Sequence, residues 1–432
     1  MGATMQFKNS IFPSVLLTGL AISSGAFANE NQAAFEDTIA TLCSETGEPP
    51  INDLPPTDFI PTDSFDFATF STSTATVDSE CADIAQLGLT DDVLAQVTPD
   101  EAPALHTSLV QLSSDQIQNI SRHLNNLRTR VRTEGKQTAQ YVLDAYYGGA
   151  ASSELATSGR FSVFLNGSFV DGDQDSTDYE VGYDLSTDHY TLGVDYRLSQ
   201  HFLVGFAYGS SETELKYSQF NDQSDNDTDH YILYASWYRD NFAVDTTLGF
   251  ASGEFSTLRH LPDAEARGET DNDMTYFSVS GSYDFSQGGW SYGPKASLDW
   301  LDGDIDGFSE SGDSAWAATF EDQEVESLIL AMGGYVNYAA SFNWGVLVPH
   351  ARAEWRNEFE DDRDLIVGRF VADPNTQFDI TPDDPDSSWF QANIGVSAVF
   401  AHGISAFLDY EEIISYNDTD LSIFSGGVRF EF

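Results

Sequence analysis

Apolar and polar residues alternate with a period of two from Gly159 to the last residue, Phe432. In the stretch 390–400, for example, apolar side chains occupy every second position, and small or polar side chains occupy most of the others. Successive side chains of a β-strand point to opposite faces, so the pattern predicts strands with one apolar face. Each run is about ten residues long, the length that a tilted strand needs to cross a bilayer.

The connections between these runs indicate a membrane barrel. We count twelve strands, which begin near residues 160, 189, 201, 229, 241, 273, 289, 322, 343, 388, 403 and 419. Short turns are expected to alternate with long loops at 170–187, 210–228, 256–272, 302–320 and 357–387. Short periplasmic turns, long external loops and an even strand count are typical of outer-membrane barrels, and the 13% aromatic content suits their interfacial girdles. We therefore expect an all-β membrane fold, a 12-stranded antiparallel β-barrel over residues 159–432.

The first 28 residues have the layout of a secretory signal peptide. Lys8 supplies the positive start, Ile11 to Ser23 is apolar but too short to span a bilayer, and Ala26 and Ala28 fit the small-x-small cleavage rule. No run of 18 apolar residues occurs beyond this segment, which excludes a bundle of membrane-spanning helices. Export followed by a barrel predicts a location in the bacterial outer membrane, with loops at the cell surface.

Residues 29–112 differ from the rest of the chain, because they contain 16 acidic residues and no lysine or arginine. High net charge and broken periodicity predict a short, poorly ordered acidic segment, with helical pieces near Cys43 and after Cys81. These are the two cysteines of the sequence. Export permits disulfides, so a Cys43–Cys81 bridge is the simplest interpretation.

Residues 113–147 return to a helical pattern. Ser113 and Gln116 fit a capping box at the start of a helix. Apolar residues then recur at helical spacing, at Ile117, Ile120, Leu124, Leu127 and Val131. The same stretch holds five of the 18 basic residues, namely Arg122, Arg128, Arg130, Arg132 and Lys136.

Two interpretations of this basic helix remain open. It could be an ordinary amphipathic helix that packs on a partner, or a helix threaded through a barrel with an acidic lumen. Opposite charges attract strongly in a partly dehydrated pore, which favours the second interpretation.

The formal net charge of −52 limits the partners of the chain. A field of this sign repels nucleic acid, so we expect no nucleic-acid partner. The acidity suits solubility in a salty habitat, and the alternative is binding or bridging of divalent cations at the cell surface.

Four stretches in the barrel region resemble the autotransporter β-domain family, in the order in which that family has them. Pro349 to Asp362 is similar to its P-x-x-R-x-x-W-x-x-E-F pattern, and Ile305 to Gly312 is similar to its I-x-G-F-x-E-x-G segment. Gly193 to Arg197 matches its G-x-D-Y-R run. The last strand, Ser425 to Phe432, resembles its assembly signal.

This resemblance implies a translocator of type V secretion that exports or displays its own N-terminal segment, with a helix kept in the pore. Its implied partners are outer-membrane lipid and the barrel-assembly machinery, and we expect a monomer. The candidate passenger is shorter than about 90 residues, far below the usual length. The residues of the implied assembly signal are Ser425, Gly427, Phe430 and Phe432.

Two local motifs each have a structural interpretation without a function and a functional interpretation. Asn125 and Asn126 are either a pair on the helix surface or a self-cleavage site, which some autotransporters have in their pore helix. An Asp-rich stretch nearly fits a calcium-binding EF-hand loop, although coincidence in an acidic loop is the preferred interpretation. Its candidate ligands are Asp302, Asp304, Asp306 and Asp313.

The sequence contains no G-x-S-x-G and no H-E-x-x-H motif, and its eight histidines do not cluster at metal spacing. We therefore predict no enzymatic activity and no cofactor. The alternatives to a translocator are a porin-like passive channel and a surface adhesin or interaction module.

Overall fold

The structure is a computed structural model that describes residues 30–45, 91–135 and 160–432, except 263, 361, 362, 401, 402 and 417. The expected signal peptide and Cys81 lie outside the described residues. Cys43 is buried, and its bridge to Cys81 stays a prediction.

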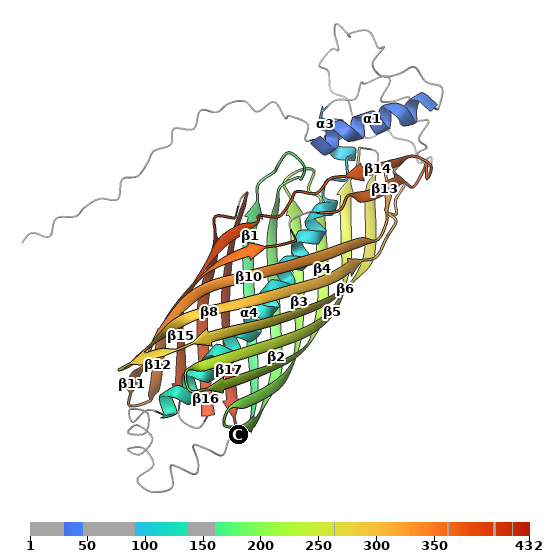
Figure 1. Ribbon diagram of the computed structural model, residues 1–432. Helices are drawn as coiled ribbons and strands as arrows, with labels where there is room; N and C mark the ends of the chain where they lie inside the picture. The colour runs from blue at the N-terminus through green and yellow to red at the C-terminus, as the bar shows by residue number, and fades with distance from the viewer. Residues whose placement is uncertain are drawn as a thin grey trace, which may run out of the picture.

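Twelve long antiparallel strands close into a barrel, which confirms the predicted fold (Figure 1). The last strand pairs with the first over 13 residue pairs, from Ser162 opposite Glu431 to Gln174 opposite Thr419. Closure leaves no open edge, as a barrel in lipid requires. In ring order the strands are β1 (Phe161–Gln174), β2 (Tyr183–Ser199), β3 (Phe202–Tyr217), β4 (Gln223–Arg239), β5 (Phe242–His260), β6 (Glu265–Tyr283), β8 (Trp290–Ile305), β10 (Gln323–Tyr338), β12 (Gly345–Glu358), β15 (Ser388–Phe400), β16 (Ile404–Ile414) and β17 (Thr419–Glu431). Short strands β7 (Phe285–Gln287) and β11 (Ala340–Phe342) continue β6 and β10 along the chain and pair with β8 and β12.

The strands are longer than predicted on the loop side. They have between 11 and 19 residues, and β6 begins at Glu265 rather than near residue 273. The long loops expected at 170–187, 210–228 and 256–272 are therefore wrong, because strand continues through most of each. These extensions carry acidic and small polar residues, so they lack the apolar alternation that marks a membrane-crossing strand.

Acidic side chains face one another on the outer surface of these extensions. Glu212 lies opposite Asp227, Asp227 lies opposite Glu254, and Glu254 lies opposite Asp271. Directly opposite like charges destabilise a sheet pair. The pattern accounts for part of the acidity, and both interpretations of that acidity stay predictions.

On the turn side of these acidic strand extensions, the outer surface of the barrel is apolar. Leu192, Leu233 and Leu408 are each 53% exposed, and Ile394 is 63% exposed. Aromatic residues such as Trp290 lie beside them. In water such a belt would be costly, whereas lipid covers it. None of the helices among the described residues is long and apolar enough to cross a membrane.

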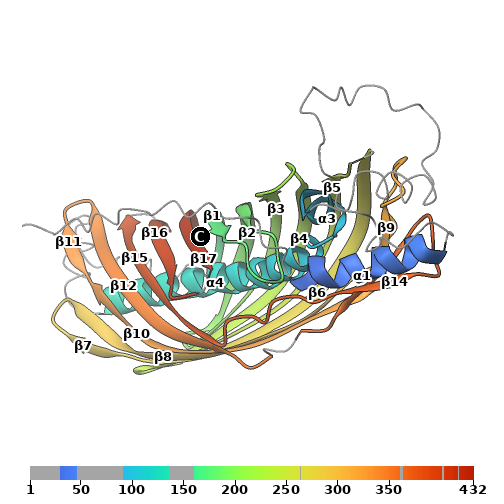
Figure 2. The same ribbon diagram turned by 90° about the horizontal axis from the view of Figure 1, so that it is seen from above.

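A long helix, α4 (Ala102–Gly135), lies inside the barrel, and Figures 1 and 2 show it running along the inner side of the wall. It begins 11 residues before the predicted start, so the capping box at Ser113 and Gln116 is wrong. Ser113 lies in the helix interior, where its Oγ donates to the carbonyl of Val110 at 2.9 Å. Pro103 lies in the first turn, where a helix tolerates a residue without an N–H.

The described parts of the N-terminal segment before α4, residues 30–45 and 91–101, form a cap on the loop side of the barrel (Figure 1). Two helices, α1 (Glu30–Glu45) and α3 (Asp91–Val97), confirm the predicted helical pieces. They pack on a small sheet made by the loops, with strands β9 (Ala318–Phe320), β13 (Ile366–Phe370) and β14 (Gln377–Ile380). The ring of Phe35 lies 5.5 Å from that of Phe370 and 5.0 Å from that of Phe378.

Hydrogen bonds tie the start of α1 to two loops. Asn31 Nδ2 donates to the carbonyls of Tyr179 and Thr381 at 2.7 and 2.8 Å, and Asn31 Oδ1 accepts from Thr381 N at 2.8 Å. The same two loops are also joined to each other, because Glu180 Oε1 accepts from Asp383 N at 2.9 Å. Burial raises the pKa of Glu180 to about 7 and also raises the pKa of Asp383.

The raised pKa of Glu180 makes the loop packing pH-dependent. The packed loops bind the Glu180 proton more tightly than the unpacked loops do. The stability that protonated Glu180 contributes to the packing is therefore fully present below about pH 4.5 and is lost as the pH rises through about 7. We expect the amide protons of residues 175–182 to be less protected from exchange at pH 8 than at pH 5. The difference should correspond to a loss of stability on the order of 1–3 kcal/mol. Glu180→Gln is the control, and an equally steep pH dependence in that variant would contradict the assignment.

Aromatic rings in the lumen lie directly over glycines of the neighbouring strand. A Cβ on Gly205 would lie 2.1 Å from Cζ of Tyr234, whereas a Cβ on Gly281 would meet nothing within 4 Å. We expect Gly205→Ala to lower the free energy of unfolding by roughly 1–3 kcal/mol, because Tyr234 must leave its position. Gly281→Ala should change it little. Denaturant titration in detergent micelles measures both, and equal effects would show that the ring placement is unimportant.

Candidate functional site in the pore

The candidate site is the contact between α4 and the inner wall of the barrel. One face of the helix is apolar and buried, as the spacing of Ile117, Ile120, Leu124 and Leu127 predicts. These residues belong to one hydrophobic cluster with inward-facing wall residues such as Phe164. The apolar contact fills much of the lumen, and polar contacts then fix the position of the helix.

The first polar contact centres on Glu411 of β16, which is fully buried. Arg122 Nη1 of α4 lies 3.3 Å from Glu411 Oε1, and Arg352 of β12 pairs with the other oxygen. Gln391 of β15 donates to Oε1 at 2.7 Å. Arg352 also donates to Gln118 Oε1 of α4 at 2.8 Å, so three strands hold two turns of the helix.

The second contact centres on Asp195 of β2. His123 of α4 stacks on Phe164 with ring centroids 3.7 Å apart, and its Nε2 lies 3.0 Å from Asp195 Oδ2. Tyr234 and Arg429 reach the same carboxylate at 2.5 and 3.3 Å. Because Arg429 is in the last strand, this contact also spans the seam between β17 and β1.

A third set of contacts is spread along the helix. Lys295 Nζ of β8 donates to Ser121 Oγ at 3.1 Å and lies 3.4 Å from Glu354 Oε1. Asn119 donates to Thr191 Oγ1 at 3.0 Å. The helix is therefore held by strands from all sides of the ring.

The structure tests the predicted basic residues in part. Arg122 lies in the pore and pairs with an acid of the wall. The side chains of Arg128, Arg130 and Arg132 and the whole of Lys136 lie outside the described residues. The described part of the lumen is a mixture of charges rather than simply acidic, because Lys295, Arg352 and Arg429 of the wall pair with wall acids. Sequence analysis missed the other polar helix residues that contact the wall, which are Gln118, Asn119, Ser121 and His123.

The paired asparagines lie near the turn side of α4. Asn126 Oδ1 accepts a hydrogen bond from Ser397 Oγ at 2.7 Å. Asn125 and Asn126 line a cavity together with Asp284, Lys295 and other wall residues. Cleavage between them stays a prediction.

The implied assembly signal forms part of β17. Ser425 is buried on the lumen side, whereas Phe430 and Phe432 are 45% and 71% exposed on the outside. A Cβ on Gly427 would lie 2.2 Å from Asn166 Oδ1 and 2.5 Å from Cε1 of Phe407, so a larger residue there would displace these two side chains. Phe432 N donates to the carbonyl of Phe161 at 2.8 Å and completes the seam. Recognition of these residues by assembly machinery stays a prediction.

Two of the four candidate calcium ligands lie on a strand rather than in a loop. Asp302 and Asp304 belong to β8, Asp306 directly follows it, and all three face outward. Alternate residues of a strand are roughly 7 Å apart, so their carboxylates spread along the wall instead of converging. Asp313 lies in the following loop. Within the described ranges, no three acidic, histidine or cysteine side chains are placed to hold a metal ion.

Comparison with known proteins agrees with this architecture. The chain is 24% identical over 275 residues to two proteins named Esterase EstA, from Pseudomonas aeruginosa and Pseudomonas putida. The match covers 61% of this chain and 42% of each esterase, so the chain spans less than half the length of these relatives.

The translocator domain of the autotransporter NalP from Neisseria meningitidis has a similar fold, with a TM-score of 0.52 and 14% identity. That match covers 71% of this chain and 98% of the NalP domain. The family model described as Autotransporter beta-domain matches residues 163–411, which is more than half of the chain. The chain is an outer-membrane translocator barrel and belongs to the autotransporter β-domain family.

Proposed function

We propose that this barrel displays its N-terminal segment at the cell surface and keeps it tethered there as a cap. The observation that carries the proposal is the direction of α4, which enters the pore at the loop side and ends at the turn side. In outer-membrane barrels the loops face outward and the turns face the periplasm. The described residues before Ala102, which are 30–45 and 91–101, therefore lie outside the cell, and the barrel follows from the periplasmic end of the helix.

Several contacts support a tethered cap rather than a released passenger. Arg259 of β5 donates to the carbonyl of Val97 at 2.9 Å and pairs with Glu310 at 3.1 Å. Its Nε also lies 3.4 Å from Glu101, directly before α4. Together with the apolar contacts of Phe35, these bonds attach both ends of the cap to the loops.

The proposal extends to the partners of the barrel. The apolar belt contacts outer-membrane lipid, and the barrel acts as a monomer. We assign the last strand, with Ser425, Gly427, Phe430 and Phe432, to recognition by the barrel-assembly machinery. The likeness to proteins named esterases does not bring an esterase activity to this chain, and the proposal gives the barrel no catalytic step.

A passive channel is the less favoured function, because α4 fills the lumen and the wall side chains bind to it. An adhesive role of the cap is compatible with display, but no contact among the described residues identifies a ligand for it.

Display is tested by protease treatment of intact cells that carry an epitope tag inserted between residues 45 and 91. Proteinase K is the suitable enzyme, because residues 29–112 have no lysine or arginine for trypsin to cut. We expect loss of the tag while the outer membrane is intact. A tag that is cut only after permeabilisation would place the segment in the periplasm and refute display.

The plug is tested by conductance in planar bilayers. Deleting residues 102–135 should convert a barrel of low conductance into an open pore, because nothing else among the described residues fills the lumen. Deleting residues 30–97 is the matched control, which removes the cap but keeps α4, and should leave the conductance low. Unchanged conductance without residues 102–135 would mean that the helix does not block the pore.

A further inference from the structure

The seam between β17 and β1 differs from the other junctions of the ring. These strands are the last and the first, so no turn joins them, whereas elsewhere the chain itself runs from each strand to the next. On the lipid side of the seam, Gly167 lies directly opposite Gly426. Cross-strand side-chain pairs stabilise a sheet, and two glycines supply none. Apart from the backbone hydrogen bonds, closure at this level therefore depends on side chains of the lumen side.

Two residues of α4 contact the lumen side of the seam. Asn119 and His123 are about one helical turn apart, so they lie on the same face of the helix. Asn166 Nδ2 of β1 donates to Asn119 Oδ1 at 2.9 Å, and Asn119 Nδ2 donates to Thr191 Oγ1 of β2 at 3.0 Å. The side chain of Asn166 lies over Gly427 of β17, where a Cβ would be 2.2 Å from its Oδ1. The helix thereby holds a side chain of β1 across the seam.

The second helix residue, His123, orients a carboxylate that joins β17 to β1. Its ring stacks on Phe164 of β1, and its Nε2 lies 3.1 and 3.0 Å from the two carboxylate oxygens of Asp195. Asp195 Oδ2 accepts from Ser162 Oγ of β1 at 2.9 Å and lies 3.3 Å from Nε of Arg429 in β17. Arg429 Nη2 also donates to Ser162 Oγ at 2.7 Å, which is a bond directly across the seam.

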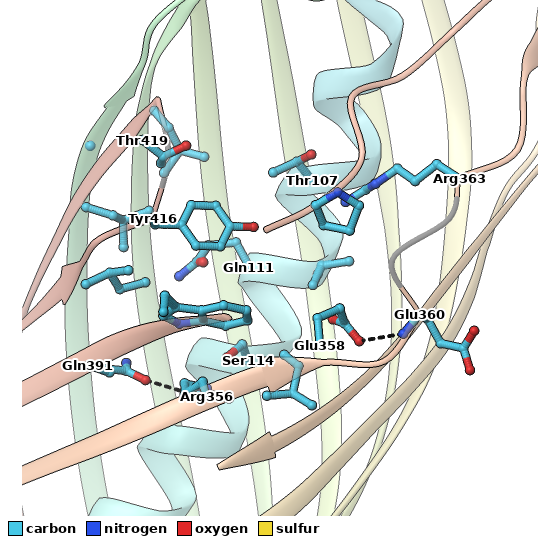
Figure 3. A pocket seen from close by; sticks show the side chains of 18 of the residues that line it. Thr107, Gln111, Ser114, Arg356, Glu358, Glu360, Arg363, Gln391, Tyr416 and Thr419 are labelled. Atoms are coloured by element: carbon cyan, nitrogen blue, oxygen red, sulfur yellow. Dashed lines mark hydrogen bonds between the residues drawn. The ribbon is translucent and has the colours of Figure 1, made fainter. Parts of the chain in front are cut away.

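Away from the seam, wall strands are joined by side-chain bonds of their own. Figure 3 shows such a bond beside α4, in which Arg356 Nη1 of β12 donates to Gln391 Oε1 of β15 at 2.6 Å. Nη2 of Arg356 donates to Asp299 Oδ2 of β8 at 3.1 Å. These two bonds join three strands without a residue of the helix. Loss of the helix contacts should therefore affect this part of the wall less than it affects the seam.

We propose that α4 locks the seam, so that the barrel opens first between β17 and β1 when the helix contacts are lost. The lock consists of Asn119 and His123 on the helix and of Asn166, Asp195 and Arg429 on the wall. Such an opening is lateral, toward the lipid, and differs from the opening of the pore along its axis. The proposal does not depend on which side of the membrane the cap lies, so failure of display would leave it standing.

Hydrogen exchange of the full chain in detergent micelles, followed by mass spectrometry, tests the lock with two double variants. Asn119→Ala with His123→Ala removes both contacts at the seam. Gln118→Ala with Ser121→Ala is the matched control, because it removes two helix contacts with β12 and β8.

In the first double variant, we expect amides of the seam, in residues 162–170 and 423–431, to exchange at least about fivefold faster than in the unchanged protein. Amides of residues 244–250 in β5 and 275–281 in β6 should keep nearly the original rate. In the control variant the seam amides should also keep the original rate.

A conservative variant keeps the test decisive if the first double variant does not show the heat-modifiable mobility of a folded barrel. His123→Phe retains a ring on Phe164 but cannot pair with Asp195, and it should speed exchange at the seam by about twofold to threefold. Unchanged exchange at the seam of a folded variant would overturn the proposal, because the seam would then close without the helix. Equally faster exchange in β5 and β6, or an equal effect of the control variant, would also overturn it.

Discussion

The buried polar contact between α4 and the barrel wall is the interaction on which the rest of the structure depends. A barrel of about eight strands can be filled by its own side chains, whereas 16 or more strands leave a channel. Twelve strands lie between these limits, and here a helix fills the space. Removing one partner of a buried ion pair costs more than the pair itself contributes. Glu411 and Asp195 therefore fix where the helix sits more than they raise the overall stability.

The position of the helix determines what lies outside the membrane. Because α4 enters at the loop side, α1 and α3 must lie on the loops, and the second apolar cluster covers them there. Phe370 of β13 and Phe378 of β14 pack against the ring of Phe35 in α1. The cap, the helix in the pore and the barrel wall thus pack against one another along the length of the molecule.

Much of the barrel could be predicted, because a lipid-facing strand must alternate and a turn between strands must be short. The loop-side strand ends could not, since residues such as Asp225 and Asp227 carry no apolar pattern although their backbone still pairs. The start of α4 was hidden by Ser113 and Gln116, which look like a cap but lie within the helix. The partner of Arg122 is 289 residues away in the sequence, and no local pattern identifies such a pair. The contact of Phe35 with the loops was hidden for the same reason.

Hydrogen exchange along α4 tests the central claim most directly, with Glu411→Gln compared with Glu412→Gln. The first change removes the buried carboxylate that pairs with Arg122 and leaves Arg352 only its pair with Glu354, whereas the second alters an exposed neighbour on the outer face. If the buried network holds the helix, amides of residues 117–127 should exchange at least about tenfold faster in Glu411→Gln, which corresponds to about 1.4 kcal/mol of lost protection, and at the original rate in Glu412→Gln. Equal exchange in both variants would mean that packing alone keeps the helix in the pore.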